Sequence, residues 1–215
     1  FRDMKDRFEN MSSCERGAPT VPHAKRGLTL SQLRDLQEAY ISSKWLQQQC
    51  EAFNRENPDN IGATHESPMS ENFYALKRFV VMPLTHPDSC DTVPRHEASM
   101  ARCGHPCSYA ELANPCGVRV DYFVSHCWGH SCQGTMTALE TFAQEVHKSI
   151  AKPSPDEVVF WICIFALDLH NPDREAGPSP QEGGPLLGAA PAKALHGSVV
   201  LLDTEARAFQ RIWCL

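Results

Sequence analysis

Residues 121–129, which read DYFVSHCWG, constrain the fold of this chain more than any other stretch. The apolar, β-branched and aromatic residues at its start are typical of a strand, and the small, polar and glycine residues after them are typical of a turn. Two more apolar runs follow, VVFWICIFALD at 158–168 and SVVLLD at 198–203. Unbroken apolar runs are typical of strands buried on both faces. We therefore predict three strands.

The segment between the first two runs changes its period. Apolar residues recur there every three or four positions, as expected for a helix over 134–150 with one buried stripe (Met136, Leu139, Ala143, Val146 and Ile150). Thr137 and Glu140 are spaced for a capping box. Strand, helix, strand, long connection and strand in succession predict an α/β fold with a parallel sheet, because parallel neighbours need long crossovers.

Polar residues follow each predicted strand. Ser125, His126, Cys127 and Trp128 come after the first strand, Asp168 ends the second and Asp203 ends the third. Sheets of this kind bind ligands beyond the carboxyl ends of their strands. A binding site at this edge and ordinary loop polarity are both compatible with the pattern.

The chain before the predicted sheet is helical and irregular. We predict a flexible leader at 1–27, a helical segment with an irregular loop at 28–106, and an α/β domain at 107–215. A long helix over 28–57 has apolar residues at helical spacing, with Thr29 or Ser31 as its cap.

Two shorter segments also carry local signals. Residues 70–82 read as a short amphipathic helix, or a helix leading into a strand, that ends at Pro83. Ser108 and Glu111 form a second candidate capping box. Residues 171–197 are rich in proline, glycine and alanine, which predicts a flexible insertion rather than a lid.

Cysteine and histidine residues crowd into the irregular loop, and zinc in proteins is held by four such ligands. The pair Cys103 and Cys107 has close spacing, and Cys90 or His96, together with Cys116, could complete a site. The loop lacks a regular pair-plus-pair pattern. Structural zinc and scattered, unliganded side chains therefore remain alternatives.

The sequence lacks the motifs of several enzyme classes. Neighbouring residues at a strand end point in opposite directions, so Ser125 and His126 do not form a catalytic dyad through closeness in sequence. The sequence has no G-x-S-x-G elbow, no P-loop and no G-x-G-x-x-G after the first strand.

Composition and charge indicate which kinds of partner and which cellular compartment to expect. The net charge of −6 over 215 residues, without a basic run, argues against nucleic acid as a main partner. No apolar run reaches the roughly 18 residues of a membrane helix. The charged N-terminus is unlike a secretory signal, so we expect a cytoplasmic protein whose ten cysteines stay reduced.

Three blocks resemble a known family. DYFVSHCWG at 121–129 resembles the first strand of TIR-like domains, which often read D-x-F-[IVL]-S-[HFY]. The second run, at 158–171, is similar to a strand of the related HET domains and of algal multidomain proteins with an F-V-S-H-x-W-G motif, although Asp168-Leu169 replaces their usual Asn-Gln. SVVLLDTEARAFQRIWCL at 198–215 is similar to their third strand and R-x-W-C helix start. The resemblance covers about residues 107–215.

The resemblance implies a flavodoxin-like parallel sheet, of which this chain holds the first three strands. In TIR domains that cleave NAD, a catalytic glutamate follows the W-C pair, and we expect it beyond Leu215. The motif positions that carry over as nucleotide-binding candidates are Ser125, His126, Trp128, Asp168 and Trp213. In many relatives the same residues are structural, so Trp128 and Trp213 could instead belong to the core.

Three functional hypotheses follow. The first is an intracellular TIR/HET-like signalling or defence module that in a longer form cleaves NAD, with NAD as substrate rather than bound cofactor. The second is a non-enzymatic interaction module that self-associates through the helix at 28–57 and an open sheet edge. The third is a zinc-stabilised structural domain.

Overall fold

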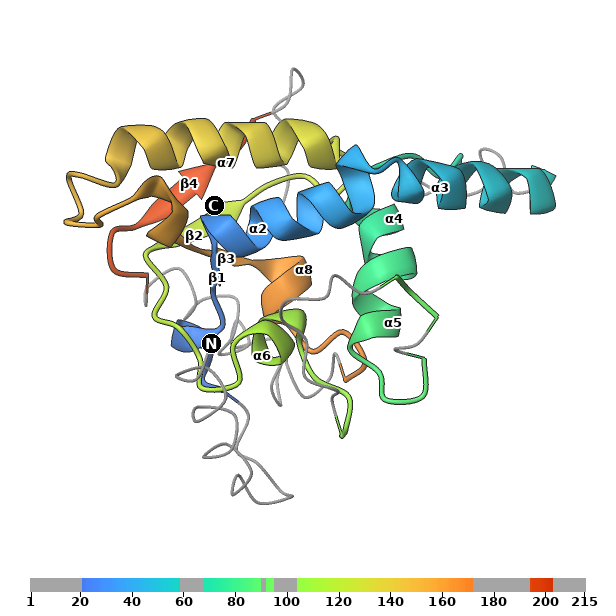
Figure 1. The fold of residues 1–215 in the computed structure, drawn as a ribbon, viewed down its shortest axis with the longest axis horizontal. Helices are drawn as coiled ribbons and strands as arrows, with labels where there is room; N and C mark the ends of the chain where they lie inside the picture. Colours follow the sequence, from blue (N-terminus) through green and yellow to red (C-terminus); the bar gives the residue numbers. More distant parts are fainter. Residues whose placement is uncertain (1–20, 59–67, 90–91, 95–103, 172–193, 203–215) are drawn as a thin grey trace, which may run out of the picture.

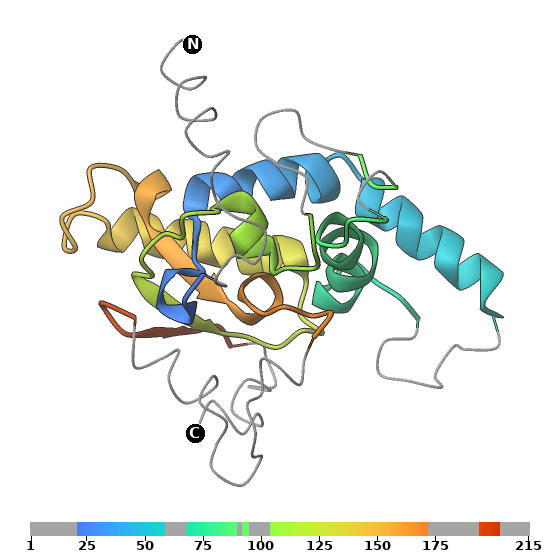
Figure 2. The same ribbon diagram turned by 90° about the horizontal axis from the view of Figure 1, so that it is seen from below.

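A computed structural model of the chain describes residues 21–58, 68–89, 92–94, 104–171 and 194–202. It shows a mixed α/β fold built on a four-stranded sheet (Figure 1). Seen from below, the helices α2 (Leu30–Leu36) and α7 (Cys132–Val146) lie over the same side of the strands (Figure 2). An ion pair between Arg34 and Glu140 joins these two helices.

The sheet has the strand order β1-β3-β2-β4. β2 (Tyr122–Ser125) pairs in parallel with both β3 (Val159–Ile162) and β4 (Ser198–Val200), as the sequence predicts. β1 (Leu28–Thr29) pairs antiparallel with β3. The sheet is therefore mixed, and the prediction of a wholly parallel sheet is wrong. The apolar residue of β1 continues the spacing of the following helix, so its sequence carries no separate strand signal.

The second apolar run is divided between two elements. We predicted one strand over 158–168, but β3 ends at Ile162 and the helix α8 (Cys163–Ala166) follows at once. Short apolar runs do not distinguish a buried strand from a buried helix. In α8 the ring of Phe165 lies 5.4 Å from that of Tyr109, so this helix contributes to the core.

The predicted long helix at 28–57 is broken into several pieces. A capping box between Thr29 and Gln32 starts α2, which leads into a π-helix, η3 (Gln37–Ser42). Lys44 then adopts a left-handed conformation with φ of 65°, and α3 (Trp45–Glu56) begins after it. The apolar spacing continues across this break, which explains why the sequence predicts a single helix.

Residues 73–84 form one helical unit, which resolves the choice between helix and strand. It consists of α4 (Phe73–Leu76), the π-helix η5 (Lys77–Val81) and α5 (Met82–Leu84). The helix was expected to end at Pro83 but includes it, as the second residue of α5.

Two predicted capping boxes have different outcomes. The box between Ser108 and Glu111 is confirmed at the start of α6 (Tyr109–Ala113). The box between Thr137 and Glu140 is wrong. α7 starts earlier, and Ser131 caps it by accepting a hydrogen bond from the Gly134 N–H at 3.3 Å.

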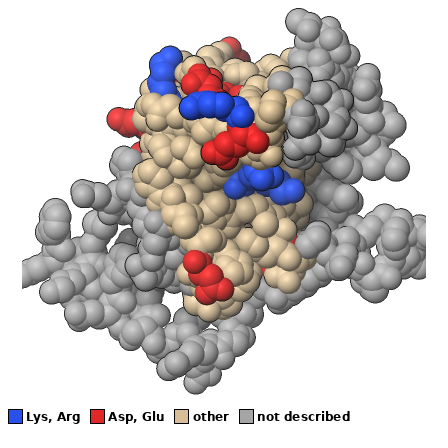
Figure 3. All heavy atoms as spheres, turned by 90° about the vertical axis from the view of Figure 1, so that its right-hand side faces the viewer, with Lys and Arg blue, Asp and Glu red and all other residues tan. Residues whose placement is uncertain are grey.

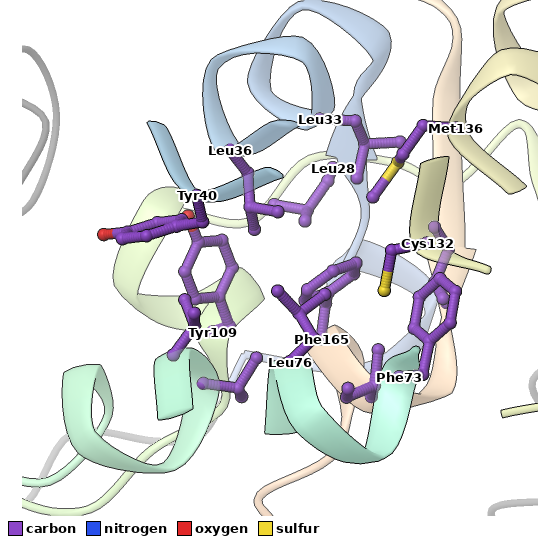
Figure 4. Packing of buried hydrophobic residues seen from close by; sticks show 14 of the residues in the cluster. Leu28, Leu33, Leu36, Tyr40, Phe73, Leu76, Tyr109, Cys132, Met136 and Phe165 are labelled. Carbon is purple, nitrogen blue, oxygen red and sulfur yellow. The ribbon is translucent and has the colours of Figure 1, made fainter. Parts of the chain in front are cut away.

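The main hydrophobic cluster draws on both predicted segments, 28–106 and 107–215. Leucines of β1 and α2 meet Met136 and Cys132 of α7, and Phe73 of α4 lies opposite (Figure 4). The other face of the sheet carries a smaller cluster centred on Phe123 and Trp161, whose rings stack with centroids 5.0 Å apart. Both faces of β2 and β3 are therefore buried, as their apolar sequences predict.

Two buried charged side chains tie the connecting segments to the sheet. Asp121 accepts hydrogen bonds from the Val159 N–H and from Lys152 Nζ, both at 2.9 Å, and so aligns the starts of β2 and β3. Arg26, in the predicted leader, is 3% exposed and donates to the carbonyls of Val21 and Ala166. The helices η2 (His23–Lys25) and η6 (Pro155–Glu157) lie just before β1 and β3. Among the described residues, no helix is long and apolar enough to cross a membrane.

Candidate functional site

The SHCWG loop after β2 docks on the start of α4. The N–H of Phe73 donates to the carbonyl of Trp128 at 2.9 Å, and the N–H of Cys132 donates to that of Glu71 at 3.0 Å. The side chain of Asn72 caps α4 by accepting from the Tyr74 and Ala75 N–H groups. Segments that lie some fifty residues apart in sequence therefore form one joint at the carboxyl end of β2.

Ser125 and His126 are inside this joint. Their exposed fractions are 5% and 2%, and the imidazole of His126 packs on the ring of Phe73 with centroids 4.3 Å apart. The Ser125 carbonyl accepts from the Leu201 N–H at 2.9 Å, which extends the pairing of β2 with β4. Both residues lie where the sequence places them, at the strand end, but they are enclosed by protein.

Trp128 is half-buried at the rim of the joint. Its indole Nε1–H donates to Cys163 Sγ at 3.0 Å, which links the loop after β2 to the end of β3. The ring of Tyr74 meets it edge-on at 5.5 Å, and Lys77 Nζ lies 5.9 Å from the ring centroid. Sequence reasoning missed Tyr74 and Lys77. They are three residues apart on a helix, which was a usable signal that they share a face.

Asp168 lies beyond α8 and organises its own turn. Its carboxylate accepts from the His170 N–H at 3.0 Å and from the Asn171 side-chain amide at 2.8 Å. An aspartate that bonds residues two and three positions ahead is typical of a turn. The hydrogen bonds of Asp168 are therefore local, although only 5% of its surface is exposed.

His170, which the sequence analysis did not select, docks on the end of α5. Thr85 Oγ1 donates its proton to the Val81 carbonyl at 2.7 Å, so it accepts from His170 Nε2–H at 2.9 Å. Burial lowers the pKa of His170, and His86, whose ring lies 5.2 Å away, adds to that effect while Asp168 opposes it. A neutral imidazole is thus favoured at this contact.

Only some of the predicted zinc ligands lie in the described part of the chain. Cys90, His96 and Cys103 lie outside the described residues, as does Trp213. Cys107 is buried and Cys116 is exposed. Among the described residues, no three His, Cys, Asp or Glu side chains gather as metal ligands would. Zinc binding by this loop stays a prediction.

Four of the described cysteines are free thiols: Cys50, Cys116, Cys127 and Cys132. Burial, with the charge of Glu71, raises the pKa of Cys50 to about 12. Burial also raises the pKa of Cys132. Such thiols remain protonated and behave as small hydrophobic side chains rather than nucleophiles.

Charge is evenly mixed on the face that includes α3 and α4. In Figure 3, Lys and Arg alternate with Asp and Glu, and neither sign dominates the described surface of that view. This distribution gives no support to nucleic-acid binding there, because such binding needs clustered basic residues.

The chain matches no protein-family model, no curated protein and no solved structure.

Proposed function

We propose that this chain contains a TIR/HET-like α/β module of intracellular signalling or defence, which acts by binding another protein chain rather than by chemistry at the SHCWG loop. The order of its parallel strands supports this architecture. β2 comes first of the three and lies between β3 and β4. A flavodoxin-like sheet begins in the same 2-1-3 order.

One observation carries the functional part of the proposal: the loop residues are engaged in holding the fold. His126 is enclosed against Phe73, and the Trp128 indole N–H is directed at Cys163. Polar groups that serve a reaction need access to a substrate, and a candidate base must come within hydrogen-bond reach of it. The free thiols of Cys50, Cys116, Cys127 and Cys132 support an intracellular location, because thiols stay reduced there.

The test measures nicotinamide release from NAD by the chain and by a form of the protein that continues past Leu215. We expect no release above buffer from either. Trp128→Phe keeps an aromatic ring but removes the hydrogen bond to Cys163, and Trp45→Phe on α3 is the matched control. Release that Trp128→Phe reduces and Trp45→Phe does not would overturn the proposal.

NAD cleavage is the second candidate function, and the rim of the joint favours it. Tyr74, Lys77 and Trp128 place two aromatic rings and an ammonium group at the carboxyl edge. Rings and cations are the groups that contact the bases and phosphates of nucleotides. In this version the nucleotide would contact the rim, with Ser125, His126 and Asp168 supporting that edge from within the fold, and a glutamate beyond Leu215 would stabilise the charge that develops as nicotinamide leaves.

A further inference from the structure

The helical unit at 73–84 is held at both ends by segments that leave the central strands. At its start, the SHCWG loop after β2 docks by accepting a hydrogen bond from the Phe73 N–H. At its end, the turn that follows β3 and α8 contacts Thr85 and His86 through the side chain of His170 (Figure 1). This second contact brings two imidazole rings together, so protons can act on it.

The hydrogen bonds at this contact show which ring atoms carry protons. The Thr85 hydroxyl donates to the Val81 carbonyl at 2.7 Å, so its oxygen accepts from Nε2–H of His170 at 2.9 Å. Nδ1 of His86 accepts from the Asp88 N–H at 3.2 Å, so that nitrogen carries no proton. The ring of His86 is therefore neutral here, and protonating it at Nδ1 breaks this hydrogen bond.

The contact accommodates two neutral rings, or one charged ring, better than two charged rings. The ring centroids lie 5.2 Å apart, so two imidazolium ions repel each other. Burial lowers the pKa of His170, and the neighbouring His86 lowers it further. Asp168 and a hydrogen bond with the Met82 backbone oppose this pKa shift. Among the described residues, the Asp88 carboxylate also faces the rings, 3.8 Å from Nδ1 of His86, and favours a charge there.

We infer that the contact between His170, His86 and Thr85 is an acid-sensitive latch, which holds the turn after α8 against the end of α5 at neutral pH and releases it in acid. Docking lowers the pKa of the His170 ring, so the undocked ring takes up its proton first. The latch is therefore at full strength above the ordinary histidine pKa of 6.5 and weakens as the pH falls below that value. It is a property of the fold and does not depend on what the protein binds.

Release in acid moves the turn as a unit. The hydrogen bonds that shape the turn are local, since the Asp168 carboxylate accepts from the His170 N–H at 3.0 Å and from the Asn171 side-chain amide at 2.8 Å. These bonds do not involve α5, so they survive when the ring of His170 leaves Thr85. Acid therefore weakens one of the two contacts that hold the helical unit and leaves the backbone hydrogen bond at the other.

Hydrogen exchange of the full chain, followed by mass spectrometry at about pH 7.5 and about pH 5.5, tests this latch. After correction for the intrinsic effect of pH, we expect peptides that cover 82–89 and 168–171 to exchange several-fold faster in acid, and peptides from α7 to show no such change. His170→Gln keeps an N–H donor at this position but cannot carry a charge, so it should remove the acid response. His147→Gln is the matched control and should keep the response, because the ring of His147 contacts its own helix at the Gln144 carbonyl, 3.0 Å away.

A second variant removes the neighbouring charge. His86→Asn keeps an acceptor for the Asp88 N–H, so we expect it to preserve the contact at neutral pH and to reduce the acid response. No acid response in the wild type, or the same response in the wild type and both variants, would overturn the latch. Fast exchange of the His170→Gln protein at every pH would overturn it as well, unless His86→Asn reduces the acid response.

Discussion

The two edges of the sheet differ in the partners of their outward-facing backbone groups. At β1, the outward carbonyl of Gly27 accepts from Asn114 Nδ2 at 3.0 Å, and the outward N–H of Thr29 donates to Gln32 Oε1 at 3.0 Å. Gln32 and Asn114 also bond each other. At β4, the outward groups of alternate residues have no such partners among the described residues. Side-chain amides thus close the β1 edge, whereas no described residue closes the β4 edge.

This contrast shows that closing a sheet edge takes dedicated side chains. An unpaired strand edge is a template for further pairing. Amides can replace a neighbouring strand because each offers both a donor and an acceptor. The described residues of β4 and its flanks, 194–202, contain neither a charged residue nor proline, which are residues that commonly protect a strand edge.

The largest expected effect compares one leucine from each edge. Leu28 of β1 is 1% exposed and Leu202 beyond β4 is 53% exposed. Leu28→Ala should lower the free energy of unfolding by about 2–5 kcal/mol, because it leaves a cavity in a packed core. Leu202→Ala should change it by less than about 0.5 kcal/mol. Urea unfolding of dilute protein measures both, and equal losses would contradict the contrast.

Gly27→Ala tests how tightly the closed edge is packed. A Cβ at this position would lie 2.3 Å from Val159 Cγ1 and 3.3 Å from Val120 Cγ2. Both valines are buried, so we expect a loss of about 1–3 kcal/mol from overpacking. Gly104→Ala is the control, since nothing lies within 4 Å of its Cβ. A Gly27→Ala protein as stable as the wild type in thermal unfolding would show that the strands can separate to admit the methyl group.

Asn114→Ala should open the closed edge. It removes the donor to Gly27 and both bonds with Gln32, which are partly buried, so the expected loss is about 1–2 kcal/mol. A double-mutant cycle with Gln32→Ala should show coupling, because neighbours in one network are not additive. Additive losses would mean that the two amides act independently. Gln47→Ala is the control, because it removes an exposed hydrogen bond from the Gln47 side-chain amide to Glu51.

Gly197→Ala is expected to have the smallest effect. Gly197 enters β4 with φ of +103°, a conformation that side chains disfavour, but no atom lies within 4 Å of its Cβ. Backbone strain alone should lower stability by about 1 kcal/mol. The melting temperature of dilute protein measures it. A loss as large as that of Gly27→Ala would show that the start of β4 is packed as tightly as the start of β1.

Much of the fold was predictable from local patterns. The apolar runs at β2, β3 and β4, the spacing within α7 and the capping box at Ser108 all rely on residues near one another in sequence. The errors occurred where one local pattern fits two structures. Leu28 fits a strand as well as a helix, and Cys163 fits a helix as well as a strand.

The candidate site was predictable in position but not in surroundings. Ser125, His126 and Trp128 follow a strand, and the structure places them at its carboxyl end. Phe73, Tyr74 and the other residues of α4 enclose them. This segment lies some fifty residues earlier in the chain, and the sequence around 121–129 does not predict the contact.

The sequence by itself determined the positions of β2, β3, β4 and α7 and that the three strands run in parallel, because hydrophobic period and connection length are local properties of a chain. Only the tertiary structure decided that β1 joins the sheet antiparallel, that Trp128 donates a hydrogen bond to Cys163, and that side-chain amides close the β1 edge. Each of these depends on which distant segments meet, and that choice is made by packing and hydrogen bonding across the whole core.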